Sequence, residues 1–556
     1  MNQETQQCQN CKQDFTIESE DFDFYEKIKV PPPTFCSECR LQRRLTHRNE
    51  RNLYHRACDS CNKKVITIYH PESKNMIYCH NCWWAFDKWD PLDYAKEYDF
   101  SRPFFEQWRE LANSVPRDGL INSNSVNSEY TNLAADNKDC YMLFESSNNE
   151  RCNHSYWMQL SKDCLDCAFV NNSELCYEVF VAWNCYKLFF SKECRDCTDS
   201  YFLQDCVGCS NCYGCVGLRK KSYCVFSKQY SKEDYFKILE EKKSQIEEGN
   251  VGDLKKTFKE FALKQINKYA YIQKSVRSTG DRLLNVKNCI YCFDGYDAEN
   301  CKYGYHVWRN SKDNMDVCTA GRDAELIYES INMGMKDYNI KFGIQNWNGN
   351  NDLTYCEACS GSSNLFGCAS LHAKQYCILN KQYTKEEYEE LVPKIIKHMG
   401  EMPYIDKKGR VYRYGEFSPV EISQFSYNNS SAFDHFPLSR EQAIAEGYKW
   451  RDQEEKNVNI GGDILACEHE GKCDEHCTVG FRIIQAEKDF YEKMGLPIPK
   501  LCPNCRHYER LKQRNPLKLW HRKCMHEGCS NEFETSYAPD RPEIVYCEQC
   551  YNAEVA

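Results

Sequence analysis

Cysteines near the two ends of this 556-residue chain are separated by the same intervals. Intervals of 25, 19 and 18 residues follow one another in both places: Cys11 to Cys36, Cys39 to Cys58 and Cys61 to Cys79 near the start, and Cys477 to Cys502, Cys505 to Cys524 and Cys529 to Cys547 near the finish. Because three equal intervals in one order rarely arise by chance, the pattern predicts an internal duplication. Each copy holds four close cysteine pairs, which predicts two tetrahedral metal sites per copy.

Zinc is the metal that these pairs favour, because a C-x2-C turn supplies two thiolates and a second pair closes the tetrahedron. We therefore expect about four zinc ions per chain, each worth roughly 10–16 kcal/mol of apparent binding energy. The second copy is irregular, so Cys467, His469 or His526 stays open as a replacement ligand. The predicted ligands are Cys8, Cys11, Cys36, Cys39, Cys58, Cys61, Cys79 and Cys82, then Cys473, Cys477, Cys502, Cys505, Cys524, Cys529, Cys547 and Cys550.

The first 40 residues also carry aromatic and proline positions around the cysteines. A C-x2-C pair is followed by Phe15, then by Phe24-Tyr25, Pro33 and a C-x2-C-R ending at Arg40. This order resembles the small bacterial "probable zinc-ribbon" domain family, over about 35 residues in each copy. The resemblance implies a zinc-ribbon fold and favours sequential pairing, in which the first two cysteine pairs form one site and the next two pairs form the other. A cross-braced pairing stays open.

A basic stretch lies between the second and third cysteine pairs of each copy. Residues 40–56 carry a net charge of +5 and residues 506–523 carry +6, whereas the whole chain carries −10. Arginine forks suit phosphate, so these stretches predict contact with nucleic acid or a nucleoprotein complex. The alternative is that the arginines pair with acidic residues elsewhere in the protein. The predicted nucleic-acid contacts are Arg40, Arg43, Arg44, Arg48, Arg506, Arg510, Arg514 and Arg522.

The middle of the chain is rich in cysteine but lacks the zinc-ribbon spacing. Cys140, Cys164, Cys185 and Cys206 are separated by 24, 21 and 21 residues, among short aromatic and β-branched segments. This spacing predicts a parallel β-solenoid with one coil per twenty-odd residues and thiols packed inside. A second stretch, 289–378, resembles the first. SKQYSKEDY and NKQYTKEEY each start a helix that we expect to cover the solenoid's open edge.

One cysteine run within the solenoid could ligate a cluster or a further metal ion. Cys206, Cys209, Cys212 and Cys215 form C-x2-C-x2-C-x2-C. A bare run of this kind is a weak signal for an iron–sulfur cluster, so we favour thiols packed at solenoid corners.

The chain is thus predicted to be mainly β with some α, with duplicated zinc-ribbon modules at both ends of a cysteine-rich parallel β-solenoid in two halves. The predicted boundaries are 1–100 for the N-terminal module, 120–230 and 286–400 for the solenoid halves with a helical linker at 231–285, 401–465 for an irregular strap, and 466–556 for the C-terminal module. The second half includes its helical cap.

The function that this pattern favours is a zinc-binding, non-enzymatic scaffold whose basic modules bind nucleic acid. No residues suggest a catalytic constellation. Two alternatives stay open: a solenoid enzyme that binds a polymer, and an assembly protein whose modules make protein contacts, for instance in a homodimer. The cysteine pairs, the absence of a secretory signal and the lack of an apolar run of roughly 20 residues predict a cytoplasmic protein with no membrane partner.

Overall fold

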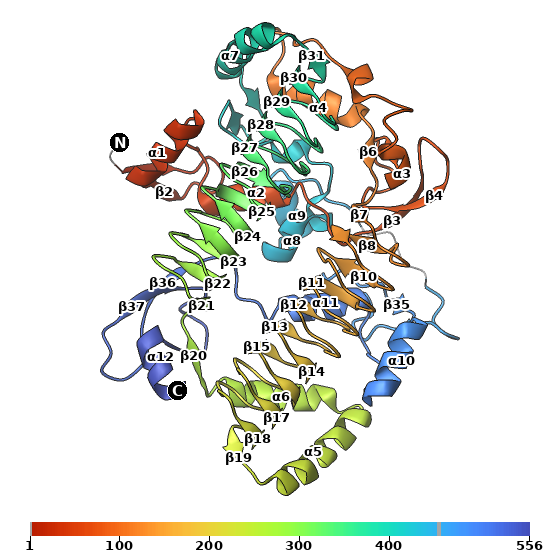
Figure 1. The fold of residues 1–556 in the computed structure, drawn as a ribbon, viewed down its shortest axis with the longest axis vertical. Coiled ribbons are helices and arrows are strands. Elements are labelled where there is room, and N and C mark those ends of the chain that lie inside the picture. Colours follow the sequence, from red (N-terminus) through yellow and green to blue (C-terminus); the bar gives the residue numbers. More distant parts are fainter. Residues whose placement is uncertain (1–2, 453–457, 556) are drawn as a thin grey trace. The chain divides into compact units, whose positions relative to one another are not determined.

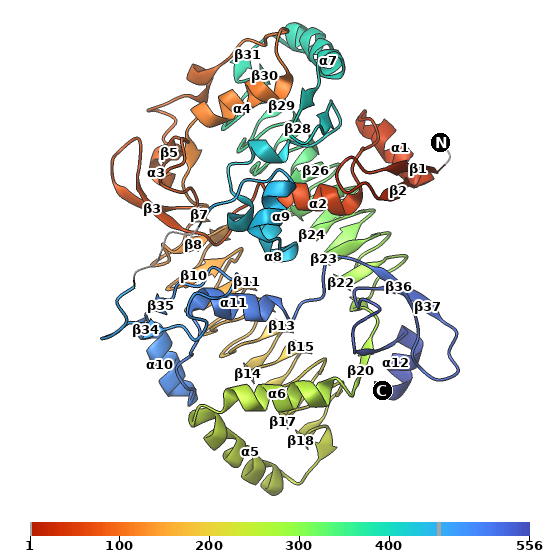
Figure 2. The same cartoon turned by 180° about the vertical axis from the view of Figure 1, so that it is seen from behind.

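The computed structural model describes residues 3–452 and 458–555, which form two compact units. Unit 1 comprises residues 1–119, 270–451 and 517–519, and unit 2 comprises 120–269, 452–516 and 520–556. The N-terminal segment therefore belongs to one unit with the second half of the middle region. The C-terminal segment belongs with the first half (Figures 1 and 2). Strand-rich parallel sheets dominate the middle region, and the helices lie mostly in the terminal segments and at the sheet ends.

The two terminal segments carry the same order of elements. Each begins with a hairpin, continues through two helices, and ends with a second hairpin, a short strand and a helix. In unit 1 these are β1 (Glu4–Gln7), β2 (Asp14–Ile17), α1 (Ser19–Ile28), α2 (Ser37–Leu45), β3 (Tyr54–Ala57), β4 (Lys64–Thr67), β5 (Ile77–Tyr78) and α3 (His80–Trp83). In unit 2 they are β34 (Leu465–Ala466), β35 (Gly480–Phe481), α10 (Gln485–Met494), α11 (Pro503–Leu511), β36 (Trp520–Lys523), β37 (Glu532–Thr535), β38 (Ile544–Tyr546) and α12 (Glu548–Val555).

The first half of the middle region is a stack of short parallel strands. Paired residues are 12 apart, as in Tyr141 with Asn153. The predicted coil of twenty-odd residues is therefore wrong, because a 24-residue cysteine interval spans two rungs of the stack. The strands are β8 (Thr131–Asn132), β10 (Tyr141–Phe144), β11 (Asn153–Gln159), β12 (Ala168–Asn171), β13 (Phe180–Trp183) and β15 (Lys192–Arg195), with β14 (Tyr186–Phe189), β16 (Thr198–Tyr201), β17 (Ser210–Tyr213), β18 (Ser222–Val225) and β19 (Lys228–Gln229) in a second sheet.

Each rung turns because every third residue adopts the left-handed conformation. Positive φ recurs from Leu133 through Phe202 at intervals of three. The residue that follows each such corner faces inward, so the buried core also recurs at multiples of three. Cysteine, serine, leucine and valine share these inward positions, as Cys140, Leu143, Cys152 and Cys164 illustrate. Small side chains suit an interior that holds four inward residues per rung.

The second half of the middle region has longer rungs at its centre. Pairs such as Tyr305 with Cys318 and Tyr338 with Asn351 are 13 residues apart, whereas the outer rungs keep 12. The extra residue falls where glycines stack: a Cβ on Gly321 would lie 2.3 Å from the Gly334 carbonyl oxygen. The strands are β21 (Ile272–Gln273), β22 (Gly280–Leu284), β23 (Cys292–Glu299), β24 (Tyr305–Lys312), β25 (Met315–Ala320), β26 (Tyr328–Ile331), β27 (Tyr338–Lys341), β28 (Asn351–Thr354), β29 (Ser363–Phe366), β30 (Gln375–Ile378) and β31 (Lys381–Gln382).

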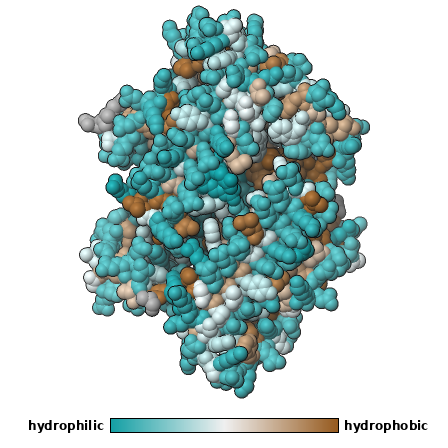
Figure 3. Space-filling model, viewed as in Figure 1, coloured by the Kyte–Doolittle hydropathy of each residue, from teal (hydrophilic) through white to brown (hydrophobic). Residues whose placement is uncertain are grey.

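A helix follows each stack, as the repeated nonapeptide predicts. Ser231 caps α5 (Lys232–Glu247) and Thr384 caps α7 (Lys385–Glu401), each by accepting a backbone N–H. Helix α5 packs against β18, and α7 packs against β30. Beyond α5, α6 (Val251–Ala262) leads to β20 (Ile266–Lys268), which pairs with β38 in unit 2. The face drawn in Figure 3 is mostly hydrophilic, which fits the inward placement of apolar residues.

Candidate metal centres and their anchoring clamps

Four groups of four cysteines could each hold a metal ion, and all four lie in the terminal segments. Within each group the four sulfur atoms lie within 4.8 Å of one another. The pairing is sequential, so the cross-braced alternative is wrong. The groups are Cys8, Cys11, Cys36 and Cys39; Cys58, Cys61, Cys79 and Cys82; Cys467, Cys477, Cys502 and Cys505; and Cys524, Cys529, Cys547 and Cys550.

The sulfur spacing fits a tetrahedral zinc site. With zinc–sulfur bonds of about 2.3 Å, tetrahedral sulfurs lie about 3.8 Å apart. The observed separations are 3.7 Å for Cys11 and Cys36, 3.9 Å for Cys61 and Cys79, and 3.8 Å for Cys467 and Cys505. All 38 cysteines are described, and none forms a disulfide. The donor sets therefore fit zinc.

Backbone amides also point at the candidate ligands. The N–H of the third cysteine in each group donates to the sulfur of the first, at 3.1–3.3 Å in the four groups. Such donors favour thiolate over thiol. A hydrogen bond with Cys505 lowers the pKa of Cys502 to about 4. Each group is thus arranged to carry negative charge that a cation would neutralise.

The first C-terminal group corrects one predicted ligand. Cys467, rather than Cys473, completes the group with Cys477, Cys502 and Cys505. Cys467 follows β34 just as Cys8 follows β1, so it occupies the matching structural position. The nearest cysteine in sequence was therefore the wrong choice. His526 is outside the second group, whose four ligands are the predicted cysteines.

The cysteines of the stacks are packed thiols instead. Cys206, Cys209, Cys212 and Cys215 occupy the four inward positions of one rung, and all are buried. Their sulfurs lie within hydrogen-bonding distance of backbone carbonyls, as a thiol donor requires; Cys215 lies 3.2 Å from the Tyr213 oxygen. Among the described residues, no stack cysteine joins a group of ligands close enough for a metal. Burial raises the pKa of Cys140, a thiol of the same core, to about 11.

In unit 1 the basic helix α2 is buried against the stack. Asp316 is fully buried between Arg40, at 2.8 Å, and Arg44, at 3.3 Å. Burial alone would lower the pKa of Arg40, but the charge of Asp316 outweighs it, so that pKa is raised. Asp316 stands at a left-handed corner, a conformation that aspartate tolerates.

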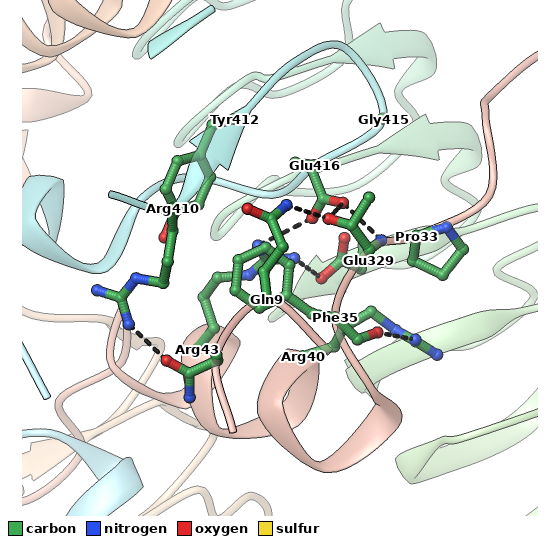
Figure 4. A network of polar contacts seen from close by, with 12 residues as sticks. Gln9, Pro33, Phe35, Arg40, Arg43, Glu329, Arg410, Tyr412, Gly415 and Glu416 are labelled. Carbon is green, nitrogen blue, oxygen red and sulfur yellow. Dashed lines mark hydrogen bonds and ion pairs between the residues drawn. The ribbon is translucent and has the colours of Figure 1, made fainter. Parts of the chain in front are cut away.

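Arg43 completes this cluster from the same helix. Its guanidinium donates to Glu329 of β26 at 2.6 Å and to Glu416 at 3.0 Å (Figure 4). It also lies over the ring of Phe35, 4.2 Å from the centroid. Burial, partly offset by Arg43, raises the pKa of Glu329. Glu416 follows β33 (Val411–Tyr412), so part of the strap between the stack and the C-terminal segment belongs to the clamp.

In unit 2 the basic helix α11 is held in the same way. Asp166, at a left-handed corner of the first stack, lies 2.6 Å from Arg506 and 2.7 Å from Arg510. Arg506 also contacts Glu487 of α10 at 3.1 Å. His154 lies 3.0 Å from Glu487. Burial opposes ionisation of Glu487, but His154 and Arg506 outweigh it and lower its pKa to about 2.

These clamps correct the predicted role of the arginines. Arg40, Arg43, Arg44, Arg506 and Arg510 are at most 5% exposed and face carboxylates, so they are not presented to a nucleic acid. The alternative, pairing with acidic residues elsewhere in the chain, describes them. The remaining three are placed otherwise: Arg48 is buried beside Glu50, Arg514 lies over the ring of Phe169, and Arg522 donates to the carbonyl of Ala538.

Unit 1 also contains a polar cavity of about 320 Å³ that the sequence did not indicate. The second N-terminal hairpin, the helix α4 (Phe104–Ser114) and strap residues 422–429 and 449–451 line it. Four lysines and arginines line this cavity against one glutamate: Lys74, Arg109, Lys449 and Arg451, with Glu72. The described residues give no carboxylate partner to Lys74 or Arg109, whereas Arg451 pairs with Glu72 at 2.7 Å.

Lys449 is the cation most constrained by this cavity. Its Nζ donates to the carbonyl of Ser423 at 2.6 Å. Burial, with the nearby charge of Arg109, lowers the pKa of Lys449 to about 8. Side-chain amides complete the wall, because Asn75 donates to Gln424 and Gln424 donates to Asn113. The cavity thus combines positive charge with neutral hydrogen-bonding groups.

Comparison with known proteins leaves the function to the structure. No protein-family model matches this chain, and no curated protein matches it. In the part of the chain that the structure describes, no helix is both long and apolar enough to cross a bilayer.

Sequence reasoning missed every acidic partner of the clamps. Asp166, Asp316 and Glu329 are single residues in a chain with 82 acidic residues, and no spacing links them to the arginines. One signal was available: Asp166 and Asp316 each lie three residues after an earlier Asp, at Asp163 and Asp313, which marks the three-residue corner period.

Proposed function

We propose that this protein is a zinc-dependent binding scaffold for nucleic acid or another phosphate-bearing partner. In this proposal the stacked rungs form a β-solenoid in two halves, and the terminal segments are zinc ribbons clamped onto them. Zinc would fold and stiffen the ribbons, since segments of this size lack a core of their own. The four groups of four cysteines and their tetrahedral spacing support this part.

The observation that carries the partner is the cavity of unit 1. Tyr54, His70 and Lys74 come from the second ribbon, next to the group that contains Cys58 and Cys79. A cation-rich cavity of this size is large enough for a phosphate with its sugar or base. The predicted nucleic-acid contact thus moves from the clamped helices to the strands of the ribbon.

Binding of a labelled single-stranded RNA by the full-length protein tests the proposal. We expect binding at low salt that weakens as salt rises, because phosphate contacts release counterions. A triple variant, Lys74→Ala, Arg109→Ala and Lys449→Ala, should lose at least about tenfold in affinity, and chelation of zinc should abolish binding. Fluorescence anisotropy measures both.

A matched triple variant removes the same charge elsewhere. Lys237, Lys385 and Lys394 are exposed on α5 and α7 and line no part of the cavity. Their replacement by alanine should change affinity less than about twofold. The proposal fails if RNA does not bind at low salt, or if both triple variants weaken binding equally.

A further inference from the structure

The first knuckle of the C-terminal segment is expanded compared with its N-terminal counterpart. Cys8 and Cys11 are separated by two residues, whereas Cys467 and Cys477 are separated by nine. The flanking geometry is the same in both, because the Cys36 N–H donates to Cys8 at 3.3 Å and the Cys502 N–H donates to Cys467 at 3.2 Å. The extra residues therefore form a loop added to a complete knuckle.

This added loop carries a second set of metal-binding side chains. His469, Cys473 and Glu475 from the loop, together with Cys505, bring four ligand atoms within 4.8 Å of one another. Cys473 and Cys505 are 3.7 Å apart, and His469 Nδ1 is 3.5 Å from a Glu475 oxygen. Zinc with nitrogen and oxygen ligands at about 2.0–2.2 Å and sulfur at about 2.3 Å requires separations of this size.

Two of these ligand atoms are buried without a hydrogen bond. Among the described residues, His469 Nδ1 and Glu475 Oε2 have no such partner, although each is shielded from solvent. Buried polar atoms left this way are costly, and a cation between them would satisfy both. The second Glu475 oxygen contacts Lys512, which holds the carboxylate in place.

Cys505 belongs to both groups. Its sulfur is 3.8 Å from Cys467 and 3.5 Å from Cys502 in the first group, and 3.7 Å from Cys473 in the second. We infer that the C-terminal segment binds a fifth zinc ion through His469, Cys473, Glu475 and Cys505, with the Cys505 thiolate bridging two metals. This inference rests on the proposed zinc at the first group.

The zinc count of the full-length protein tests the bridged site. Native mass spectrometry should give five zinc ions per chain, and both His469→Ala and Cys473→Ser should give four. Glu470→Gln, an exposed change in the same loop, should keep five. Cadmium-113 NMR of the cadmium-loaded protein should show metal–metal coupling through the shared sulfur, which His469→Ala should remove.

The outcomes separate this inference from the proposed function. Four zinc ions in the wild type, unchanged in His469→Ala and Cys473→Ser, overturn the fifth site and leave the other four. The same holds if Cys473 only replaces Cys467 as a reserve ligand, in which case cadmium coupling is absent. A count of zero overturns the zinc scaffold itself.

Discussion

The two compact units anchor their terminal segments by one device, and its repetition explains a pattern that charge alone misrepresents. In each unit, two arginines one helical turn apart share a single buried aspartate at a left-handed corner of a stack. The pairs are Arg40 and Arg44 on Asp316, and Arg506 and Arg510 on Asp166. A basic stretch in an acidic protein can therefore be an internal anchor, even where its spacing suits phosphate.

The units differ in how the clamp is completed. Unit 1 adds Arg43, which joins Glu329 and Glu416, whereas the matching position in unit 2 is Glu509, which is exposed. The strap is thus part of the anchor in unit 1. The comparison teaches that the paired arginines and their aspartate are the common element, and that the third arginine is specific to one unit.

Removal of the shared aspartate should have the largest effect. Asp316→Ala or Asp166→Ala leaves two buried guanidinium groups without their carboxylate, which should cost the affected unit about 3–5 kcal/mol in its free energy of unfolding. Native-state hydrogen exchange of α2 and α11 measures the loss in each unit. Asp313→Ala is the control, since Asp313 makes a partly exposed pair with Lys27 worth less than about 1 kcal/mol. Equal losses in Asp316→Ala and Asp313→Ala would contradict the clamp.

The third arginine should have a smaller effect that is confined to unit 1. Arg43→Met leaves Glu329 and Glu416 without their closest cation, although Arg44 remains 3.5 Å from Glu329. Because burial already raises the pKa of Glu329, proton uptake limits the loss to about 2–3 kcal/mol. Glu509→Ala, at the matching position, should change stability by less than about 0.5 kcal/mol. Urea unfolding of both variants checks the contrast, and a comparable loss in both would remove the distinction between the units.

The 13-residue rungs of unit 1 should give it a pH dependence that the 12-residue rungs of unit 2 lack. Asp337 accepts the Gly334 N–H at 2.8 Å beside the extra residue, and burial raises its pKa to about 6. A raised carboxyl pKa stabilises the fold below the unfolded pKa of about 4, and this stability is lost as pH rises through about 6. Between about pH 5 and pH 7 the wild type should lose about 1 kcal/mol locally.

Asp337→Asn tests this assignment because it cannot ionise. Hydrogen exchange around Gly334, corrected for intrinsic exchange rates, should show the pH-dependent loss in the wild type and not in the variant. A parallel slope in both proteins would place the titration elsewhere.

The candidate metal groups were largely predictable, because thiolate ligands need a local spacing that sequence displays directly. Cys473 failed because a nine-residue knuckle loop is indistinguishable from an irregular C-x3-C pair until the fold positions Cys467. The rung length was hidden because cysteine alternates with serine, leucine and valine at inward positions, so cysteine intervals sample the repeat unevenly. The clamps were out of reach, since Arg40 and Asp316 are 276 residues apart and only the folded stack brings them together.

The division of the chain into two discontinuous units also dictates an order of events during synthesis. The first segment to leave the ribosome carries Arg40, yet its aspartate follows 276 residues later, which is about 14–55 s at roughly 5–20 residues per second. Throughout that delay three guanidinium groups of α2 stay solvated and unanchored on a nascent chain. Unit 2 cannot close before its own last residues are made, so neither unit is complete until nearly the whole message has been read.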